Sequence, residues 1–225
     1  MHLLTGDAGG LQRAVAEQAA PRIYVVEDDA SVRAAIVRLL AFEKHAVKSF
    51  TSAESFLEQY DPETPGCLIL DFALPGMDGL SLQEALATRG GETPIIFLTG
   101  CADVPMTVQA MKRGAADFLT KPVDDGTLLA AVARALEKDR ALRTTREERA
   151  VVQRRLGTLT AREHEVLMQV VAGRLNKQIA SDLGTVEGTI KVHRARVMDK
   201  MRARSVAELV RLVGRIQDRY FRSSS

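Results

Sequence analysis

Several features that would define other classes of protein are missing from this sequence. Its 225 residues include only two cysteines, Cys67 and Cys101, both in apolar surroundings, which favours neither a disulfide framework nor a zinc cluster. There is no run of about 18 apolar residues, and the amino terminus lacks a basic segment followed by an apolar core. We therefore expect no membrane span, no signal peptide and a reducing, cytoplasmic setting.

Aromatic residues are scarce, at 4% of the chain. After residue 137 they are confined to Tyr220 and Phe221. Proteins that bind unpaired RNA stack its bases on aromatic side chains, so this scarcity disfavours RNA as the partner of the second half.

The net charge of +2 conceals two halves of opposite sign. Residues 21–137 carry ten basic and 17 acidic side chains, whereas residues 138–225 carry 20 basic and ten acidic ones. The chain is long enough for two modest domains, each with its own core. The charge split therefore predicts two domains, the second a candidate for binding a polyanion.

Short apolar runs alternate with amphipathic segments between residues 22 and 136. This alternation predicts a flavodoxin-like, doubly wound α/β domain with a five-stranded parallel sheet. We expect strands at residues 23–26, 46–50, 68–70, 95–98 and 117–119, and helices at 31–42, 52–60, 80–87, 104–113 and from 124 onward.

Asp71 directly follows the apolar run Leu68–Leu70 and precedes a loop rich in proline and glycine. A buried parallel strand would place Asp71 at the carboxyl edge of the sheet, where open α/β sheets have their sites. Taken alone, an Asp in this position is more often a turn residue after a strand.

Other polar residues are expected at the same edge. The first strand runs into the acidic residues 27–29, the fourth ends at Thr99, and the fifth leads to Lys121. Clustered carboxylates stay ionised only beside a cation, and oxygen ligands with room for water suit Mg²⁺. A carboxylate nucleophile beside a metal, an ammonium and a hydroxyl group has what phosphoryl transfer requires.

The second half reads as helical throughout. Residues 137–157 are dense in charges of both signs, which predicts a solvent-exposed helical linker or a weak coiled coil. Four helices follow, the first opened by a capping box of Thr160 and Glu163. A short helix, a turn containing glycine and a longer basic helix over Val186–Met201 form a helix-turn-helix. The expected caps of the last three helices are Asn176, Thr185 and Ser205.

Residues 22–136 resemble the receiver domain of bacterial response regulators. Asp71 lies 43 residues after Asp28, Thr99 lies 28 residues further on, and Lys121 another 22. The resemblance implies that Asp71 accepts a phosphoryl group from a sensor histidine kinase, with Lys121 pairing with its oxygens and Thr99 moving to hydrogen-bond them. It implies a transcription factor with at most weak self-dephosphorylation, not an enzyme.

The resemblance also implies a switch and a Mg²⁺ site. Phe118 matches the aromatic switch position, and the Lys121–Pro122 bond is expected to be cis. Taken singly, Lys121 could be a surface lysine and Thr99 a hydroxyl bonded to the backbone; their joint spacing favours the site. The implied metal ligands are Glu27, Asp28, Asp71 and the backbone carbonyl of Ala73.

Three positions depart from the usual receiver pattern. Glu27 stands where many receivers have Asp, and its longer side chain favours contact with the metal through water. Phe72 and Leu74 replace the usual polar residue and Met, so we expect a more apolar rim and an altered phosphoryl lifetime. Asp29, the third acid, is expected to be solvated.

Residues 159–216 resemble the four-helix DNA-binding domain of the NarL/FixJ and LuxR group. The matching segments are LTAREHEVL, AGRLNKQIASDLG and TVEGTIKVHRARVMDKM. The resemblance implies that the helix from Val186 enters the major groove of double-stranded DNA, although Gly188 is unusual in its first turn. Implied base-facing residues are Lys191, Val192 and Ala195, and those nearer phosphates are Lys177, Thr189, His193, Arg194 and Arg196.

The layout is similar to that of the FixJ-like subgroup. We expect an extension over residues 1–20, a receiver domain over 21–136, a helical linker over 137–157 and a LuxR-type domain over 158–225. In that subgroup phosphorylation promotes homodimerisation and frees the DNA-binding domain to regulate transcription, with RNA polymerase as a further partner.

Two other functions remain open at this point. A phosphatase or phosphotransferase of the haloacid dehalogenase type would use Asp71 as nucleophile. Such enzymes require a second Asp two residues later, where this sequence has Ala73. A constitutive DNA-binding protein would use the receiver only as a dimerisation scaffold, which the intact acid set argues against.

Overall fold

The computed structural model describes residues 20–100 and 104–214. The chain divides into two compact units, one within residues 1–142 and one within residues 143–225. Several expected features lie outside the described residues. They are most of the amino-terminal extension, Cys101, the last two residues of the four-helix domain expected over 159–216, Tyr220 and Phe221.

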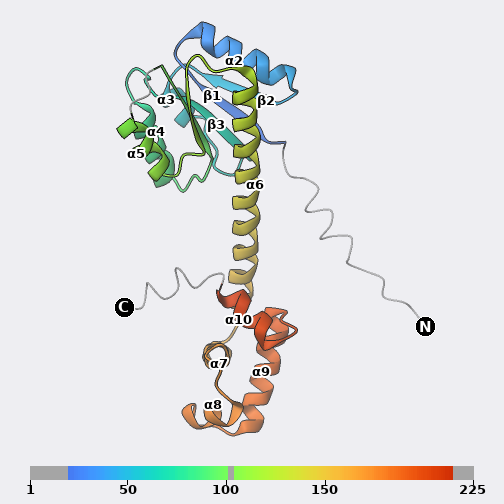
Figure 1. Ribbon diagram of the computed structural model, residues 1–225. Coiled ribbons are helices and arrows are strands. Elements are labelled where there is room, and N and C mark those ends of the chain that lie inside the picture. The colour runs from blue at the N-terminus through green and yellow to red at the C-terminus, as the bar shows by residue number, and fades with distance from the viewer. Residues whose placement is uncertain (1–19, 101–103, 215–225) are drawn as a thin grey trace, which may run out of the picture. The chain divides into compact units, whose positions relative to one another are not determined.

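The first unit contains a five-stranded sheet in which every pairing is parallel, as expected (Figure 1). The strand order is β2-β1-β3-β4-β5. Each residue of the central strand β3 is buried, because helices cover both faces of the sheet. The strands are β1 (Arg22–Val26), β2 (Ala46–Phe50), β3 (Gly66–Asp71), β4 (Ile95–Thr99) and β5 (Asp117–Thr120).

Five helices are divided between the two faces of this sheet, which confirms the doubly wound fold (Figure 1). On one face, Ile69 of β3 packs with Leu40 of α2 and Leu128 of α6. On the other, Leu70 packs with residues of the remaining three helices, including Phe56. The helices are α2 (Ala30–Phe42), α3 (Ala53–Leu57), α4 (Gly79–Thr88), α5 (Val104–Lys112) and α6 (Asp125–Leu156).

One helix, α3, is shorter than expected. Helix α3 ends at Leu57 rather than near Tyr60, because Tyr60 turns toward Thr93 and its hydroxyl lies 2.8 Å from the Thr93 hydroxyl. Helix α6 continues without a break to Leu156, so the charged segment after residue 136 is helical, as expected. Among the described residues, no helix is long and apolar enough to cross a membrane.

After the end of α6, the described part of the second unit has four further helices, α7 (Ala161–Val171), α8 (Asn176–Asp182), α9 (Glu187–Met201) and α10 (Val206–Gly214). The capping box at α7 is confirmed: the Thr160 hydroxyl accepts from the Glu163 amide, and the Glu163 carboxylate accepts from the Thr160 amide. The Ser205 cap is also confirmed, since its hydroxyl accepts from the Glu208 amide at 3.1 Å. The core is formed mainly by Val166, Leu167, Ile179, Ile190, Val197 and Leu209.

The other two expected caps are wrong. The N-cap of α8 is Leu175, and Asn176 is instead the first helical residue, with its side chain bound to Arg194. The N-cap of α9 is Val186, which has no capping side chain. Thr185 belongs to the preceding turn, where its backbone N–H donates to the Ala180 carbonyl at 2.9 Å.

Candidate functional site

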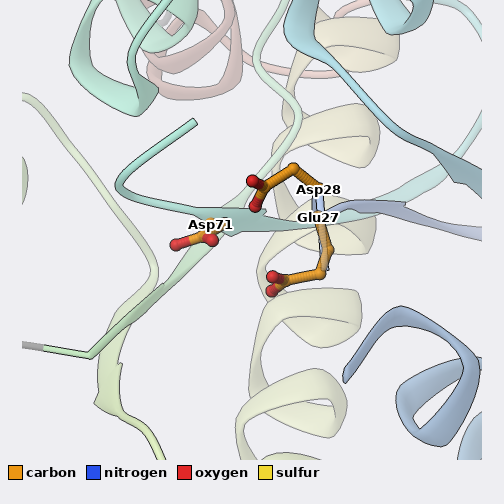
Figure 2. A group of neighbouring side chains, drawn as sticks. All are labelled: Glu27, Asp28 and Asp71. Carbon is orange, nitrogen blue, oxygen red and sulfur yellow. The ribbon is translucent and has the colours of Figure 1, made fainter. Parts of the chain in front are cut away.

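Three carboxylates meet at the carboxyl edge of the sheet (Figure 2). Glu27 and Asp28 directly follow β1, and Asp71 ends the neighbouring strand β3. One oxygen from each residue lies within 4.8 Å of the others. Glu27 and Asp71 are buried, with 1% and 5% of their surface exposed, whereas Asp28 is exposed. Parallel pairing therefore brings together acids that are far apart in the sequence.

Lys121 supplies a cation between two of these acids. Its Nζ lies 2.7 Å from Glu27 Oε2 and 3.0 Å from Asp71 Oδ2. Its backbone N–H donates to the carbonyl of Thr99 at 2.7 Å, which holds the chain after β5 against the end of β4. The following bond to Pro122 is cis, as expected. Lys121 thus contacts the site rather than standing apart as a surface lysine.

Burial and charge act against each other in this pocket. Burial raises the pKa of Glu27, the Asp71 charge raises it further, and the Lys121 ammonium partly opposes both. For Lys121, burial lowers the pKa, but hydrogen bonds to Glu27 and Asp71 outweigh it and leave the pKa raised. Glu27 and Lys121 therefore influence each other's charge.

The donor set fits a hard divalent cation. Glu27 Oε1 is buried and has no hydrogen-bond partner within residues 20–100 and 104–214, so an acceptor in the pocket is left unsatisfied. Asp71 Oδ1 accepts a hydrogen bond of 3.2 Å from the Ala73 amide. Carboxylate oxygens with one exposed member, Asp28, match the partly hydrated octahedral coordination of Mg²⁺.

Thr99 and Phe118 lie on the neighbouring strands. Thr99 ends β4 and is 3% exposed, and it pairs in register with Thr120 of β5. Phe118 is half-buried, and its ring centre lies 6.0 Å from that of Phe97 and 5.9 Å from that of Phe72. Phe72, which departs from the usual receiver pattern, therefore packs in an aromatic cluster instead of merely lining the rim.

The contacts of two residues near the acids were not predicted from the sequence. Arg33 of α2 donates from Nη1 to the carbonyls of Glu27, at 2.7 Å, and Asp28, at 3.1 Å. Asp29 caps α2, accepting from the Ser31 and Val32 amides. An Asp just before an apolar helix signals such a cap, whereas no local pattern points to Arg33.

Helix α9 has a buried face and an exposed face. Lys191, Val192 and Ala195 are exposed, with Val192 half exposed at 50%, so Val192 is not a core residue. His193 and Arg194 are half-buried at the margin, and His193 Nδ1 is buried with no partner among the described residues. The other expected DNA contacts, Lys177, Thr189 and Arg196, are all exposed.

Fold and site together define a two-domain regulator with an acidic α/β unit and a helix-turn-helix unit. Residues 23–133 match the family model "Response regulator receiver domain". Residues 157–213 match that of "Bacterial regulatory proteins, luxR family".

Known proteins resemble the chain over both units. Nodulation protein W of Bradyrhizobium diazoefficiens is 45% identical over 190 residues, which cover 84% of each chain. Transcriptional regulatory protein FixJ of Azorhizobium caulinodans is 43% identical over 190 residues, 84% of this chain and 90% of FixJ.

Solved structures of response regulators are also similar to this chain over both units. That of response regulator StyR has a TM-score of 0.76 and 44% identity, covering 87% of this chain and 99% of StyR. Full-length FixJ from B. japonicum has a TM-score of 0.54 and 37% identity, covering 87% and 97%. The chain belongs to the response regulators that join a receiver domain to a LuxR-type DNA-binding domain, and its function is two-component regulation of transcription.

Proposed function

We propose that Asp71 is the phosphoacceptor and that its phosphorylation controls DNA binding. The observation that carries this proposal is the Lys121 ammonium lying between Glu27 and Asp71, with Asp28 alongside. A buried carboxylate nucleophile with a cation in contact is what an acyl phosphate requires for its formation.

In the proposed reaction an oxygen of Asp71 forms a bond to phosphorus as the P–N bond of a kinase phosphohistidine breaks. The leaving imidazole keeps the electron pair and takes up a proton from solvent. Lys121 offsets the charge that gathers on the phosphoryl oxygens, and the Thr99 hydroxyl hydrogen-bonds one of them.

Mg²⁺ would be held by Glu27, Asp28, Asp71 and the backbone carbonyl of Ala73, and when bound it supplies further neutralisation of the phosphoryl charge. Glu27, with its longer side chain, would contact the ion through water. Its unsatisfied Oε1 supports this assignment.

The response would pass through β5 to the DNA-binding unit. Movement of Thr99 toward the phosphoryl group opens space for Phe118, which contacts Phe72 and Phe97. The altered surface promotes a homodimer, and two LuxR-type domains then bind half-sites about one helical turn apart. RNA polymerase is the expected downstream partner. Water slowly hydrolyses the acyl phosphate, so turnover is limited to weak self-dephosphorylation.

The test is labelling of the full chain with acetyl phosphate and Mg²⁺, followed by intact mass spectrometry. The wild type should gain one phosphoryl group, lost on treatment with hydroxylamine, and Asp71→Asn should gain none. Asp29→Asn is the matched control, because it removes a nearby acid but keeps a residue able to cap α2, and it should be labelled. A labelled Asp71→Asn chain, or an unlabelled wild type, contradicts the proposal.

The regulatory part needs a second measurement. Labelled wild type should sediment as a dimer and bind a duplex selected from a random pool more tightly than the unlabelled chain does. If sedimentation and affinity are the same before and after labelling, phosphorylation of Asp71 does not control dimerisation or DNA binding.

A further inference from the structure

A side-chain hydrogen bond joins the two helices of the helix-turn-helix. Arg194 Nη1, on α9, donates to Asn176 Oδ1, at the start of α8, over 2.8 Å. Asn is a favoured capping residue, yet this Asn176 side chain makes no capping bond and serves Arg194 instead. The Asn176 side chain therefore has a role other than capping the start of α8.

The acceptor in this bond is neutral. Among the described residues no carboxylate pairs with Arg194, whereas Lys191 on the same helix pairs with Glu187 at 3.3 Å. A guanidinium has five N–H donors, and the bond to Asn176 uses one of them. Arg194 is thus oriented while its charge and its other donors stay available.

Arg194 lies at the edge of the exposed face of α9. It is half-buried between the core residue Val197 and the exposed residues Lys191 and Ala195. Lys191 precedes it by three positions, which makes the two side chains neighbours on the helix surface. On α8, exposed Lys177 directly follows Asn176. The oriented guanidinium therefore belongs to a basic surface that both helices share.

We propose that Asn176 is a positioning residue for DNA binding, which holds the Arg194 guanidinium toward a backbone phosphate without neutralising it. The inference rests on DNA binding by the LuxR-type unit. Ordering the long Arg side chain before the DNA arrives removes part of the entropy cost of the contact. A carboxylate at position 176 would orient Arg194 equally well but would compete with the phosphate for its charge.

Three variants separate orientation from charge. Binding of the full chain to a fluorescein-labelled duplex, selected by the wild type from a random pool, is measured by anisotropy over a series of salt concentrations. Asn176→Ala should weaken binding about three- to tenfold and leave the slope of log Kd against log salt nearly unchanged. Arg194→Gln and Asn176→Asp should each reduce that slope by about 0.9, the loss of one phosphate contact.

The coupling is tested in a double variant. In the Arg194→Gln background, Asn176→Ala should have no further effect on Kd. Gln178→Ala is the matched control: Gln178 accepts the Leu175 amide at 2.9 Å in the same turn, so its loss weakens α8 without touching Arg194. It should bind DNA like the wild type at a temperature where circular dichroism shows it folded.

Several results would overturn the proposal. They are wild-type affinity in Asn176→Ala, a wild-type salt slope in Asn176→Asp, or an undiminished Asn176→Ala effect in the Arg194→Gln background. A wild-type chain that binds no duplex at all would instead defeat DNA binding itself, and the positioning role with it.

Discussion

The ammonium nitrogen of Lys121 lies 3.0 Å from Oδ2 of Asp71, although the two residues are 50 positions apart. The same nitrogen reaches the buried Glu27, so one cation serves two carboxylates. Because the lysine side chain is 22% exposed, the group is only partly shielded from solvent. The pocket is therefore held together by a charge balance that single substitutions can upset.

Lys121→Met should lower the free energy of unfolding at pH 7.5 in EDTA by about 2 kcal/mol, because two buried acids lose their cation. The loss should shrink on acidification. In the folded variant burial raises the Glu27 pKa without the opposing effect of the Lys121 ammonium, so the folded variant binds more protons than its unfolded chain does. Its stability therefore rises more than that of the wild type as the pH falls toward the ordinary value of 4.5. Urea unfolding at pH 7.5 and 5.5 measures both effects, and a constant difference would contradict this account.

Mg²⁺ should stabilise the receiver unit by linkage. At 100 times its Kd the ion should raise the free energy of unfolding by about 2.7 kcal/mol. Asp28→Asn should abolish most of this gain, because it removes the exposed member of the three acids. Asp29→Asn, one residue further along, should keep it. Thermal unfolding with and without Mg²⁺ is the measurement, and equal gains in both variants would argue against a metal site at these acids.

The capping box of α7 should be sensitive to acid. Hydrogen bonds from Lys200 and from the Thr160 amide lower the pKa of Glu163 to about 2, and Lys200 Nζ lies 2.6 Å from the carboxylate. A lowered pKa adds stability that is fully present above pH 4.5 and is lost as the pH falls toward 2. The gap in unfolding midpoint between wild type and Glu163→Gln, followed by circular dichroism from pH 6 to about pH 2, should therefore close.

Two glycine substitutions should act in opposite directions. A Cβ at Gly79 would lie 2.9 Å from the Phe97 ring and 3.1 Å from the Asp71 carbonyl, so Gly79→Ala should lower the free energy of unfolding by about 1–3 kcal/mol.

At Gly188 nothing lies within 4 Å of an added Cβ, so Gly188→Ala should raise the free energy of unfolding by up to about 1 kcal/mol. Chemical denaturation measures both. If Gly188→Ala also weakens DNA binding, the glycine serves close approach to the DNA backbone.

Much of the fold was predictable because its signals are local. The apolar run at Leu68–Leu70 reads as a strand buried on both faces, and β3 is indeed the central strand. Thr160 and Glu163 are three residues apart, so their capping box is visible without any tertiary information. Asn176 and Thr185 carry a similar signal, but neither is a cap. The Asn176 side chain binds the distant Arg194, and α9 begins one residue later than expected, with Val186 as its N-cap.

The sequence by itself determined the two domains, the alternation of strands and helices, and the set of acids that parallel strands must deliver to one edge, because each depends on periodicity and residue type. Only the tertiary structure decided which acids Lys121 contacts. It also decided that Arg33 binds the backbone carbonyls of Glu27 and Asp28, and that Asn176 binds Arg194. Glu27 and Lys121 are 94 residues apart, and a contact over that distance exists only after the sheet has assembled. Side-chain partners of this kind depend on packing, which no local pattern encodes.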